Sequence, residues 1–539
     1  MFTRSCRLVV GPIMAALIFS GCGKRETAVE EGIRTRTLLL GNAAEPASLD
    51  PHILNAYTDM RVTMALFEGL TALDEATARP LPGAAERWEV SADGLTYTFH
   101  LRADGKWSDG EPVVAGDFAY AFRRILTPAF GSTYAYMLWP VKNAEAFNTG
   151  KLTDFATVGV QVVDDRTLRL TLERPTAYLL SLVAHSTWFP VPRRTLERYG
   201  KMEMRDNAWS RPGNMVGNGA FILKEWKPNS VITVTKNPHY WGAALNEIER
   251  VRFFPIEQSD GEELSYRAGQ LHVTAAVPSS KVPVYRQKSP GLLRTNPLLN
   301  VSYVSFNVTK PPFNDPRVRR ALALAFDRNA ISSRVFEAVA SPAYNAVPPG
   351  CGDYPLPPGQ MTDVTAARAL LAEAGFPGGQ GLPVIPLLVM NDDKSSKIGE
   401  TLQAMWLKEL GVRISVEPLE QKTLFQNQQS LNYTIGLLGW TADYPDPYTF
   451  LEVFRGGNGN NWTGWSSARY DALLDEAGLV TQPEKRFALL QQAETLLLEA
   501  APLAPIVYAA RAYLVHPAVK NWPPSPLGIH RYQTIRLEK

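Results

Sequence analysis

The residues best suited to chemistry lie in one short stretch, Gly439–Leu451 (GWTADYPDPYTFL). Asp443 stands there as an exposed acid after a predicted strand that ends at Gly439. Aromatic side chains surround this acid, namely Trp440, Tyr444 and Tyr448. The two prolines of the stretch stiffen the loop. A carboxylate gives an ammonium group a charge-assisted hydrogen bond, and aromatic rings attract cations. The stretch therefore fits a ligand with an amine beside apolar groups.

A second interpretation of this stretch stays open on the residues alone. Asp443 can be a solvated turn residue, and the aromatic side chains around it can belong to a hydrophobic core. The two interpretations differ in whether the acid and the rings face a common cavity.

Catalytic and metal-binding patterns are absent from the sequence. The 7 His residues never stand at i,i+3 or i,i+4 spacing, and no HExxH, CxxC or EF-hand pattern occurs. A nucleotide-binding P-loop and a GxSxG turn are also missing. We therefore expect no metal, no cofactor and no enzymatic activity, with a triad of distant Ser, His and Asp residues left open.

Composition fits an ordered globular protein with several cores. The chain has 539 residues, of which 45% are hydrophobic and 20% charged. Lys and Arg number 55 against 53 Asp and Glu, a net charge of +2, so the basic footprint of a nucleic-acid binder is missing. The body of the chain has no apolar run of about 20 residues, and we expect no internal membrane span.

The N-terminus predicts secretion. Arg4 and Arg7 precede an apolar run, Leu8–Ser20, and small residues stand before Cys22. This arrangement resembles a lipoprotein signal, in which residues 1–21 are removed and Cys22 carries the lipid, although Phe19 occupies a position where Leu is usual. An ordinary signal peptide with an accidental Cys is the alternative. Residues 22–36 then form a polar tether.

The body divides into two parts of different character. The first is rich in hairpins: Thr37–Gly41 is a predicted strand, Phe221–Lys236 a hairpin, and Gln161–Glu173 two strands around a turn. From Thr362, which we expect to cap a helix, the pattern becomes β-α-β-α-β. Its strands are predicted at Leu382–Met390, Val412–Val416 and Tyr433–Gly439, which indicates a parallel sheet. Ligands bind beyond the carboxyl ends of such strands, and Asp443 follows one of them.

Motifs along nearly all of residues 37–539 resemble the family 5 solute-binding proteins of ABC importers, closest to the oligopeptide-binding branch. Their order and spacing carry the resemblance. They are EPASLDP (45–51), LFEGL (66–70), AERWEVSADGLTYTFHLRADGKWSDGEPV (85–113), GNGAFILKEW (217–226), NPHYWG (237–242), PPFNDPRVRRALALAFDR (311–328), LLAEAGF (370–376) and GWTADYPDPYTFL.

The resemblance implies an α/β fold of the two-lobed periplasmic binding protein class (Venus-flytrap, type II or cluster C), with an extra domain beside the first lobe. It implies a monomer that closes around an extended peptide and delivers it to ABC permease subunits, held at the membrane by the lipid on Cys22. The implied divisions are 37–69, 194–295 and 511–539 for the first lobe, 70–193 for the extra α+β domain and 296–510 for the second lobe.

The family's anchor for the peptide ammonium group falls on Asp443, and the same wall includes Gly439, Trp440 and Thr441. Strand-like contacts on the opposite wall fall on Asn55, Ala56 and Tyr57. An aromatic residue of the first lobe falls on Tyr134.

The sequence departs from the oligopeptide-binding branch at the residues that contact the carboxylate end of the peptide. The basic residues that meet the peptide carboxylate in the oligopeptide branch are replaced by Ser395, Gln428 and Leu437, and an acid near the amine by Asn55. This leaves room for another solute, such as a cell-wall peptide, an opine or a peptide-like signal. An extracytoplasmic hydrolase is the more distant alternative.

Overall fold

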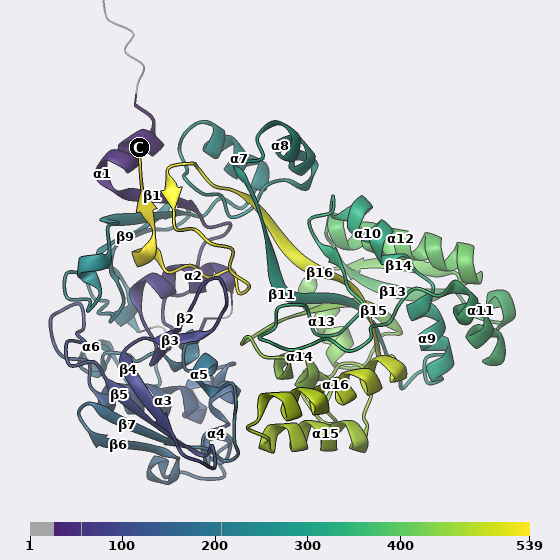
Figure 1. The fold of residues 1–539 in the computed structure, drawn as a ribbon, viewed down its shortest axis with the longest axis horizontal. Coiled ribbons are helices and arrows are strands. Elements are labelled where there is room, and N and C mark those ends of the chain that lie inside the picture. Colours follow the sequence, from purple (N-terminus) through teal and green to yellow (C-terminus); the bar gives the residue numbers. More distant parts are fainter. Residues whose placement is uncertain (1–25, 55, 206) are drawn as a thin grey trace, which may run out of the picture.

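The computed structural model describes residues 26–54, 56–205 and 207–539, without the side chains of residues 393, 421 and 422. Cys22 and Asn55 lie outside the described residues, as does the predicted signal segment. The described chain forms two lobes, which lie on the left and right of Figure 1. No helix in this part of the chain is long and apolar enough to cross a membrane.

A four-stranded sheet organises the first lobe. Its order is β1-β10-β9-β8, with β1 parallel to β10 and the other pairs antiparallel. The predicted strand 37–41 and the predicted hairpin 221–236 are both confirmed. The strands are β1 (Thr37–Gly41), β8 (Phe221–Lys227), β9 (Val231–Lys236) and β10 (Arg250–Phe254).

The segment expected to be a polar tether is helical over α1 (Ala28–Thr35). Thr27 and Glu30 form a capping box at its start, and Val29 and Gly32 are buried. The prediction of a tether was wrong here because the polar composition concealed two buried positions one turn apart.

An antiparallel sheet with order β4-β5-β7-β6 forms the lower left part of Figure 1. The two strands predicted around the turn in 161–173 are confirmed as β6 and β7. The elements of this region are β2 (Thr71–Leu73), β3 (Pro80–Pro82), β4 (Ala85–Val90), β5 (Thr96–Leu101), β6 (Val160–Asp164), β7 (Thr167–Thr171), α3 (Ala115–Leu126), α4 (Ala144–Asn148), α5 (Leu179–Leu182) and α6 (Arg193–Tyr199).

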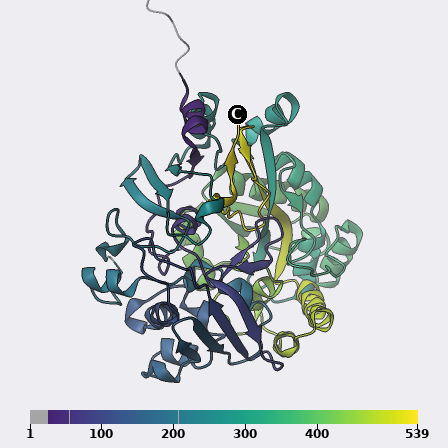
Figure 2. The ribbon, with the colours of Figure 1, turned by 60° about the vertical axis from the view of Figure 1, so that its left-hand side comes forward.

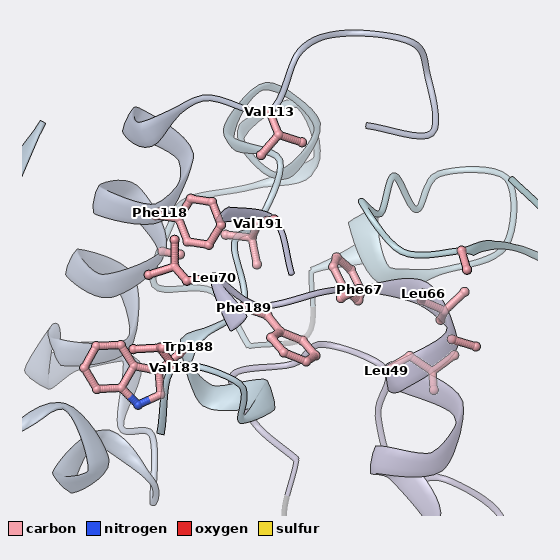
Figure 3. Packing of buried hydrophobic residues seen from close by; sticks show 14 of the residues in the cluster. Leu49, Leu66, Phe67, Leu70, Val113, Phe118, Val183, Trp188, Phe189 and Val191 are labelled. Atoms are coloured by element: carbon pink, nitrogen blue, oxygen red, sulfur yellow. The ribbon is translucent and has the colours of Figure 1, made fainter. Parts of the chain in front are cut away.

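One hydrophobic core joins this sheet to the first lobe. Leu66 and Phe67, at the end of α2 (Tyr57–Leu66), belong to the same buried cluster as Phe118 and Trp188. Figure 3 shows Phe118 and Trp188 on one side of the cluster, Phe67 and Leu66 on the other, and Phe189 between them. Apolar burial of this kind is the main stabilising term in folding, so the two regions support each other.

The second lobe has a six-stranded sheet of order β12-β16-β11-β15-β13-β14. The predicted β-α-β-α-β pattern is confirmed, since β13 runs parallel to both β14 and β15. Its elements are β11 (Leu293–Phe306), β12 (Ser341–Pro342), β13 (Ile385–Met390), β14 (Ile414–Leu419), β15 (Ile435–Thr441), β16 (Leu503–Leu514), α9 (Pro316–Leu324), α10 (Arg328–Val335), α11 (Val364–Glu373), α12 (Asp393–Leu410) and α13 (Gln421–Gln429).

Three expectations for this lobe need correction. The sheet is mixed rather than parallel, because β11, β12 and β16 join it in antiparallel pairs. Helix α11 is capped by the side chain of Asp363, not by Thr362. Strand β15 continues past Gly439 to Thr441, because residues 439–441 still pair with β11.

The strands β11 and β16 connect the lobes. They pair antiparallel from Leu293 opposite Leu514 to Ser305 opposite Leu503. Figure 1 shows the two strands running side by side from the top centre into the right-hand sheet. Each strand thus has one end near the first lobe and the other in the core of the second.

The C-terminal segment returns to the first lobe. Figures 1 and 2 show its yellow ribbon beside the purple N-terminal elements, and Tyr532 packs edge-on against Phe253 of β10 at 5.4 Å between ring centroids. The remaining elements are α7 (Ser259–Arg267), α8 (Val282–Lys288), α14 (Tyr448–Leu451), α15 (Ala468–Leu479), α16 (Pro483–Ala500), β17 (Val519–Lys520), β18 (Arg536–Leu537) and short 3-10 helices at Pro128–Phe130, Ala135–Leu138, Phe155–Thr157, Ser186–Trp188, Ala208–Ser210, Ala243–Leu245, Ser279–Lys281, Pro377–Gly379, Glu452–Phe454 and Tyr532–Thr534.

A buried ion pair within the first core gives a stability prediction. Arg124 donates to both carboxylate oxygens of Asp50, at 2.9 and 2.6 Å, and both side chains are almost fully buried. Asp50→Ala leaves the guanidinium buried without its anion, and we expect a loss of about 3–5 kcal/mol in unfolding free energy by urea denaturation. The control is Glu197→Ala, which removes the partner of exposed Arg193. Equal midpoints for the two variants would contradict the prediction.

Candidate ligand-binding site

A cavity of about 410 Å³ lies between the lobes. Most of its lining side chains are apolar, and they come from segments far apart in the sequence. Five segments supply most of the wall: the start of α2, residues 67–78, residues 181–189, the end of β15 with the loop after it, and residues 525–533. Concave, mainly apolar sites with a few polar groups are typical of small-molecule binding.

Strand β15 brings the predicted residues of the second lobe to this cavity. Trp440 and Thr441 line it, whereas Gly439 is exposed but is not part of the lining. The amide of Asn300 on β11 donates to the Thr441 hydroxyl at 2.7 Å. The indole N–H of Trp440 is buried and has no hydrogen-bond partner among the described residues. Such an unsatisfied donor is costly unless a ligand or water accepts from it.

One edge of β15 is open near the cavity. The strand pairs with β11 along its whole length, but with β13 only at Ile435 and Gly436. Within the part of the chain that the structure describes, residues 438–441 therefore have no strand partner on the side away from β11. An extended peptide can add to an edge of this kind through main-chain hydrogen bonds.

Asp443 is half-buried in the cavity wall, so the expectation of an exposed acid was wrong. One carboxylate oxygen accepts a hydrogen bond at 3.3 Å from the hydroxyl of Tyr136, which lies in the 3-10 helix Ala135–Leu138 on the first-lobe side of the cavity. Burial raises the pKa of Asp443 to about 6, and the Tyr136 hydroxyl acts in the opposite direction. No described side chain donates to the other oxygen, which leaves Asp443 a ready partner for a cationic group.

Tyr134 lies on the first-lobe side of the same place. Its ring lies over that of Tyr136, with centroids 5.8 Å apart, and against His185 at 6.0 Å. Burial, and then the charge of Asp443, raises the pKa of Tyr134 to about 12, so the hydroxyl stays protonated at neutral pH. The predicted aromatic residue and the predicted acid are thus brought together from different lobes.

The other aromatic residues near Asp443 hold the loop in place. Tyr178 of the first lobe's side stacks on Tyr444 at 4.3 Å and on Tyr448 at 5.7 Å between centroids. The Tyr444 hydroxyl donates to Glu452 at 2.7 Å. Tyr444 still lines the cavity, whereas Tyr448 is buried outside the lining. The core interpretation is therefore right for Tyr448.

The opposite wall differs from the expected strand-like contact. Ala56 is extended, with φ −126° and ψ 146°, but Tyr57 begins helix α2. Both line the cavity. The Tyr57 hydroxyl donates to the Gly528 carbonyl and accepts from Arg511 at 2.8 Å, so it is engaged within the protein.

The three positions of the absent basic clamp lie away from the cavity. Ser395 hydrogen-bonds Asp392 at the start of α12, at 2.9 Å through its backbone and 2.8 Å through its hydroxyl. Gln428 is buried and donates to the Leu437 carbonyl at 3.4 Å. None of the three lines the cavity.

Sequence reasoning missed the C-terminal wall, residues 525–533. Glu75 fixes it by accepting from His530 and from the backbone of Arg531, each at 2.8 Å. No local motif marks these residues, because their place depends on partners about 450 positions earlier in the chain.

Neither a metal-binding cluster nor a hydrogen-bonded Ser–His pair occurs among the described residues. No group of three or more His, Cys, Asp or Glu side chains is placed to hold a metal ion. His185 and His530 line the cavity and hydrogen-bond Thr187 and Glu75, and among the described residues no serine hydroxyl is hydrogen-bonded to a His ring.

Comparisons with known proteins agree with this geometry. Residues 79–462 match the family model described as bacterial extracellular solute-binding proteins, family 5 Middle. The chain is 34% identical over 531 residues to the probable deoxycholate-binding periplasmic protein YgiS of Escherichia coli K12, covering 97% of each. It is 33% identical over 529 residues to the periplasmic oligopeptide-binding protein OppA of the same strain, covering 96% of this chain and 95% of OppA.

Solved structures show the same architecture. The murein tripeptide binding protein MppA of Escherichia coli superimposes with a TM-score of 0.80 at 32% identity, covering 93% of this chain and 98% of MppA. The predicted resemblance and the predicted two-lobed fold are confirmed. The chain belongs to the family 5 bacterial extracellular solute-binding proteins.

Proposed function

We propose that this protein captures short peptides outside the cytoplasm, by closure of its two lobes, and delivers them to the permease of an ABC importer without chemical change. One observation carries the proposal: a half-buried carboxylate, Asp443, faces a cavity between the lobes at the end of a strand with an open edge. The carboxylate suits a peptide ammonium group, and the open edge suits a peptide backbone.

The cavity supports a short ligand. An apolar cavity of about 150 Å³ holds one benzene molecule. The cavity of about 410 Å³ thus corresponds to a few groups of that size, such as the residues of a di- or tripeptide. Relatives include oligopeptide-binding and murein peptide-binding proteins, which supports a peptide as the ligand class.

A second candidate ligand is an apolar acid. The lining is mainly apolar, and one relative is named a probable deoxycholate-binding protein. Such a ligand would need no amine and would leave Asp443 without a cation. Mass spectrometry of ligand retained during gentle purification separates the candidates, because a retained peptide supports the first and a retained steroid acid the second.

We place the protein at the outer face of a membrane as a monomer, anchored by lipid on Cys22. Support comes from the sequence of the N-terminal segment and from the relatives that are named periplasmic. Two or more acyl chains hold a protein firmly at a bilayer. The binding lobes begin at α1, only a few residues after Cys22, so the anchor keeps the cavity close to the permease.

The amine anchor is tested by a double comparison. Asp443→Ala leaves the ligand ammonium without its carboxylate, and we expect affinity for a free tripeptide to fall by about 2–5 kcal/mol in calorimetry. N-acetylation of the peptide removes the same charge pair and should weaken binding to the parent protein only. Glu417→Ala, an exposed acid on β14, is the matched control. An acetylation cost that is equal in the parent protein and in Asp443→Ala would refute the assignment.

Peptide affinity should also depend on pH. The pKa of Asp443 is about 6, so below pH 6 the Asp443 carboxylate of the unbound protein becomes protonated. Affinity for an ammonium ligand should then fall about tenfold for each further pH unit. Tyr136→Phe removes a hydrogen bond that lowers this pKa, so the loss should begin at higher pH. Calorimetry between pH 4 and 8 measures both curves. An Asp443→Asn variant serves as control and should lack the acidic decline.

Membrane attachment is tested at the predicted lipidation site. Cys22→Ser removes the thiol that would be acylated, so the protein should move into the soluble extracytoplasmic fraction. Cys6→Ser, within the predicted signal segment, should leave attachment unchanged. Immunoblots of separated membrane and soluble fractions measure the difference. Continued membrane association of Cys22→Ser would contradict the assignment of the lipid to Cys22.

A further inference from the structure

A cationic group also lines the cavity, from the first lobe. Arg531 is the one lysine or arginine among the described residues that line it. Its side chain is half-buried, and no described carboxylate lies within 4.0 Å to form an ion pair with it. A guanidinium in such a place can bind an anion through two parallel hydrogen bonds.

The acids near Arg531 already have other partners. Glu68 accepts from the Tyr240 hydroxyl at 2.8 Å and from the Trp241 indole at 2.7 Å. Asp74 accepts from the backbone and hydroxyl of Thr77 at 2.9 and 2.7 Å. The negative charges of these acids stabilise the Arg531 guanidinium, but the acids accept none of its hydrogen bonds.

The backbone of Arg531 is held firmly. Glu75 accepts its N–H at 2.8 Å and also accepts from His530, whose ring lies 3.9 Å from that of Trp522. The Thr534 hydroxyl donates to the same Glu75 at 3.3 Å. A side chain on a fixed backbone loses less entropy when it binds, so the position is preorganised.

Asp443 and Arg531 occupy different parts of the cavity wall. Asp443 contacts Tyr136 of the 3-10 helix Ala135–Leu138, whereas Arg531 lies beside Tyr240. Burial raises the pKa of Tyr240, and the charge and hydrogen bonding of Arg531 act in the opposite direction, which places the guanidinium next to that hydroxyl. The cavity thus presents the Asp443 carboxylate of the second lobe and the Arg531 guanidinium of the first lobe, the latter beside the acids Glu68, Asp74 and Glu75.

We propose that Arg531 binds the carboxylate of the ligand. It takes the role that Ser395, Gln428 and Leu437 cannot, from a different lobe and a different part of the chain. For a peptide ligand the inference rests on the proposed function and specifies its substrate as a compact zwitterion with a free C-terminus. For an apolar acid without an amine, Arg531 is the anchor and Asp443 is not needed.

The test combines three ligands with variants of the full-length protein in calorimetry. The ligands are a tripeptide with a free C-terminus, its C-terminal amide, and deoxycholate, an acid that has no amine. The variants are Arg531→Gln, Arg531→Lys and the control Arg536→Gln, whose arginine pairs with Glu247 at 3.2 Å on the surface. Thermal melts of Arg531→Gln and Arg536→Gln check that both variants remain folded.

In the parent protein, amidation should weaken tripeptide binding about tenfold or more, and in Arg531→Gln it should cost nothing. Arg531→Lys should keep part of the difference, because it keeps the charge but loses the fork. If tripeptides do not bind, the proposed function fails, yet deoxycholate binding that is lost in Arg531→Gln and kept in Asp443→Ala would still support Arg531. An amidation cost that persists in Arg531→Gln, or no effect of this variant on any carboxylate ligand, would overturn the inference.

Discussion

The pairing of β11 with β16 is the constraint on which the rest of the molecule depends. The two long strands contact each other from Leu293–Leu514 to Ser305–Leu503 and thereby join the lobes. Strand β15 is positioned by β11, so the Trp440–Asp443 wall follows from the same pair. The segment that leaves β16 supplies part of the opposite wall, at residues 525–533. The Trp440–Asp443 wall and the segment 525–533 are therefore both attached to one antiparallel ladder.

The acids behind and within the cavity wall are stabilised by hydroxyl groups. Asp443 accepts from Tyr136, and Glu452 accepts from Tyr444. Burial raises the pKa of Asp443 to about 6 and that of Glu452 to about 7. A hydroxyl compensates a buried carboxylate less well than a cation does, so this wall is electrostatically incomplete by itself. The Tyr136 contact crosses the cavity, so the pKa of Asp443 depends on a hydroxyl from the opposite side.

Sequence patterns predicted the parts whose cause is local or whose motifs are distinctive. The β-α-β-α-β order, the hairpin 221–236 and the acid in the GWTADY stretch all came from short segments. The pattern failed at α1, where a capping box signalled a helix that polar composition concealed. It also failed to show that β11 and β16 make the second sheet mixed, because that pairing joins residues about 200 positions apart. The position of Arg531 in the cavity wall could not be predicted for the same reason, because a hydrogen bond to Glu75 fixes its backbone.

The return of the C-terminus to the first lobe has a consequence for the order of folding. Tyr57 hydrogen-bonds the Gly528 carbonyl, and Glu75 hydrogen-bonds His530 and Arg531. These early residues can therefore form their contacts only after the last part of the chain has been made. Contacts of such sequence separation form slowly, because their loop-closure entropy must first be overcome. A chain that emerges from its N-terminus therefore cannot complete the cavity until nearly all of it is available. A chain without its last residues therefore lacks the part of the cavity wall that residues 525–533 supply.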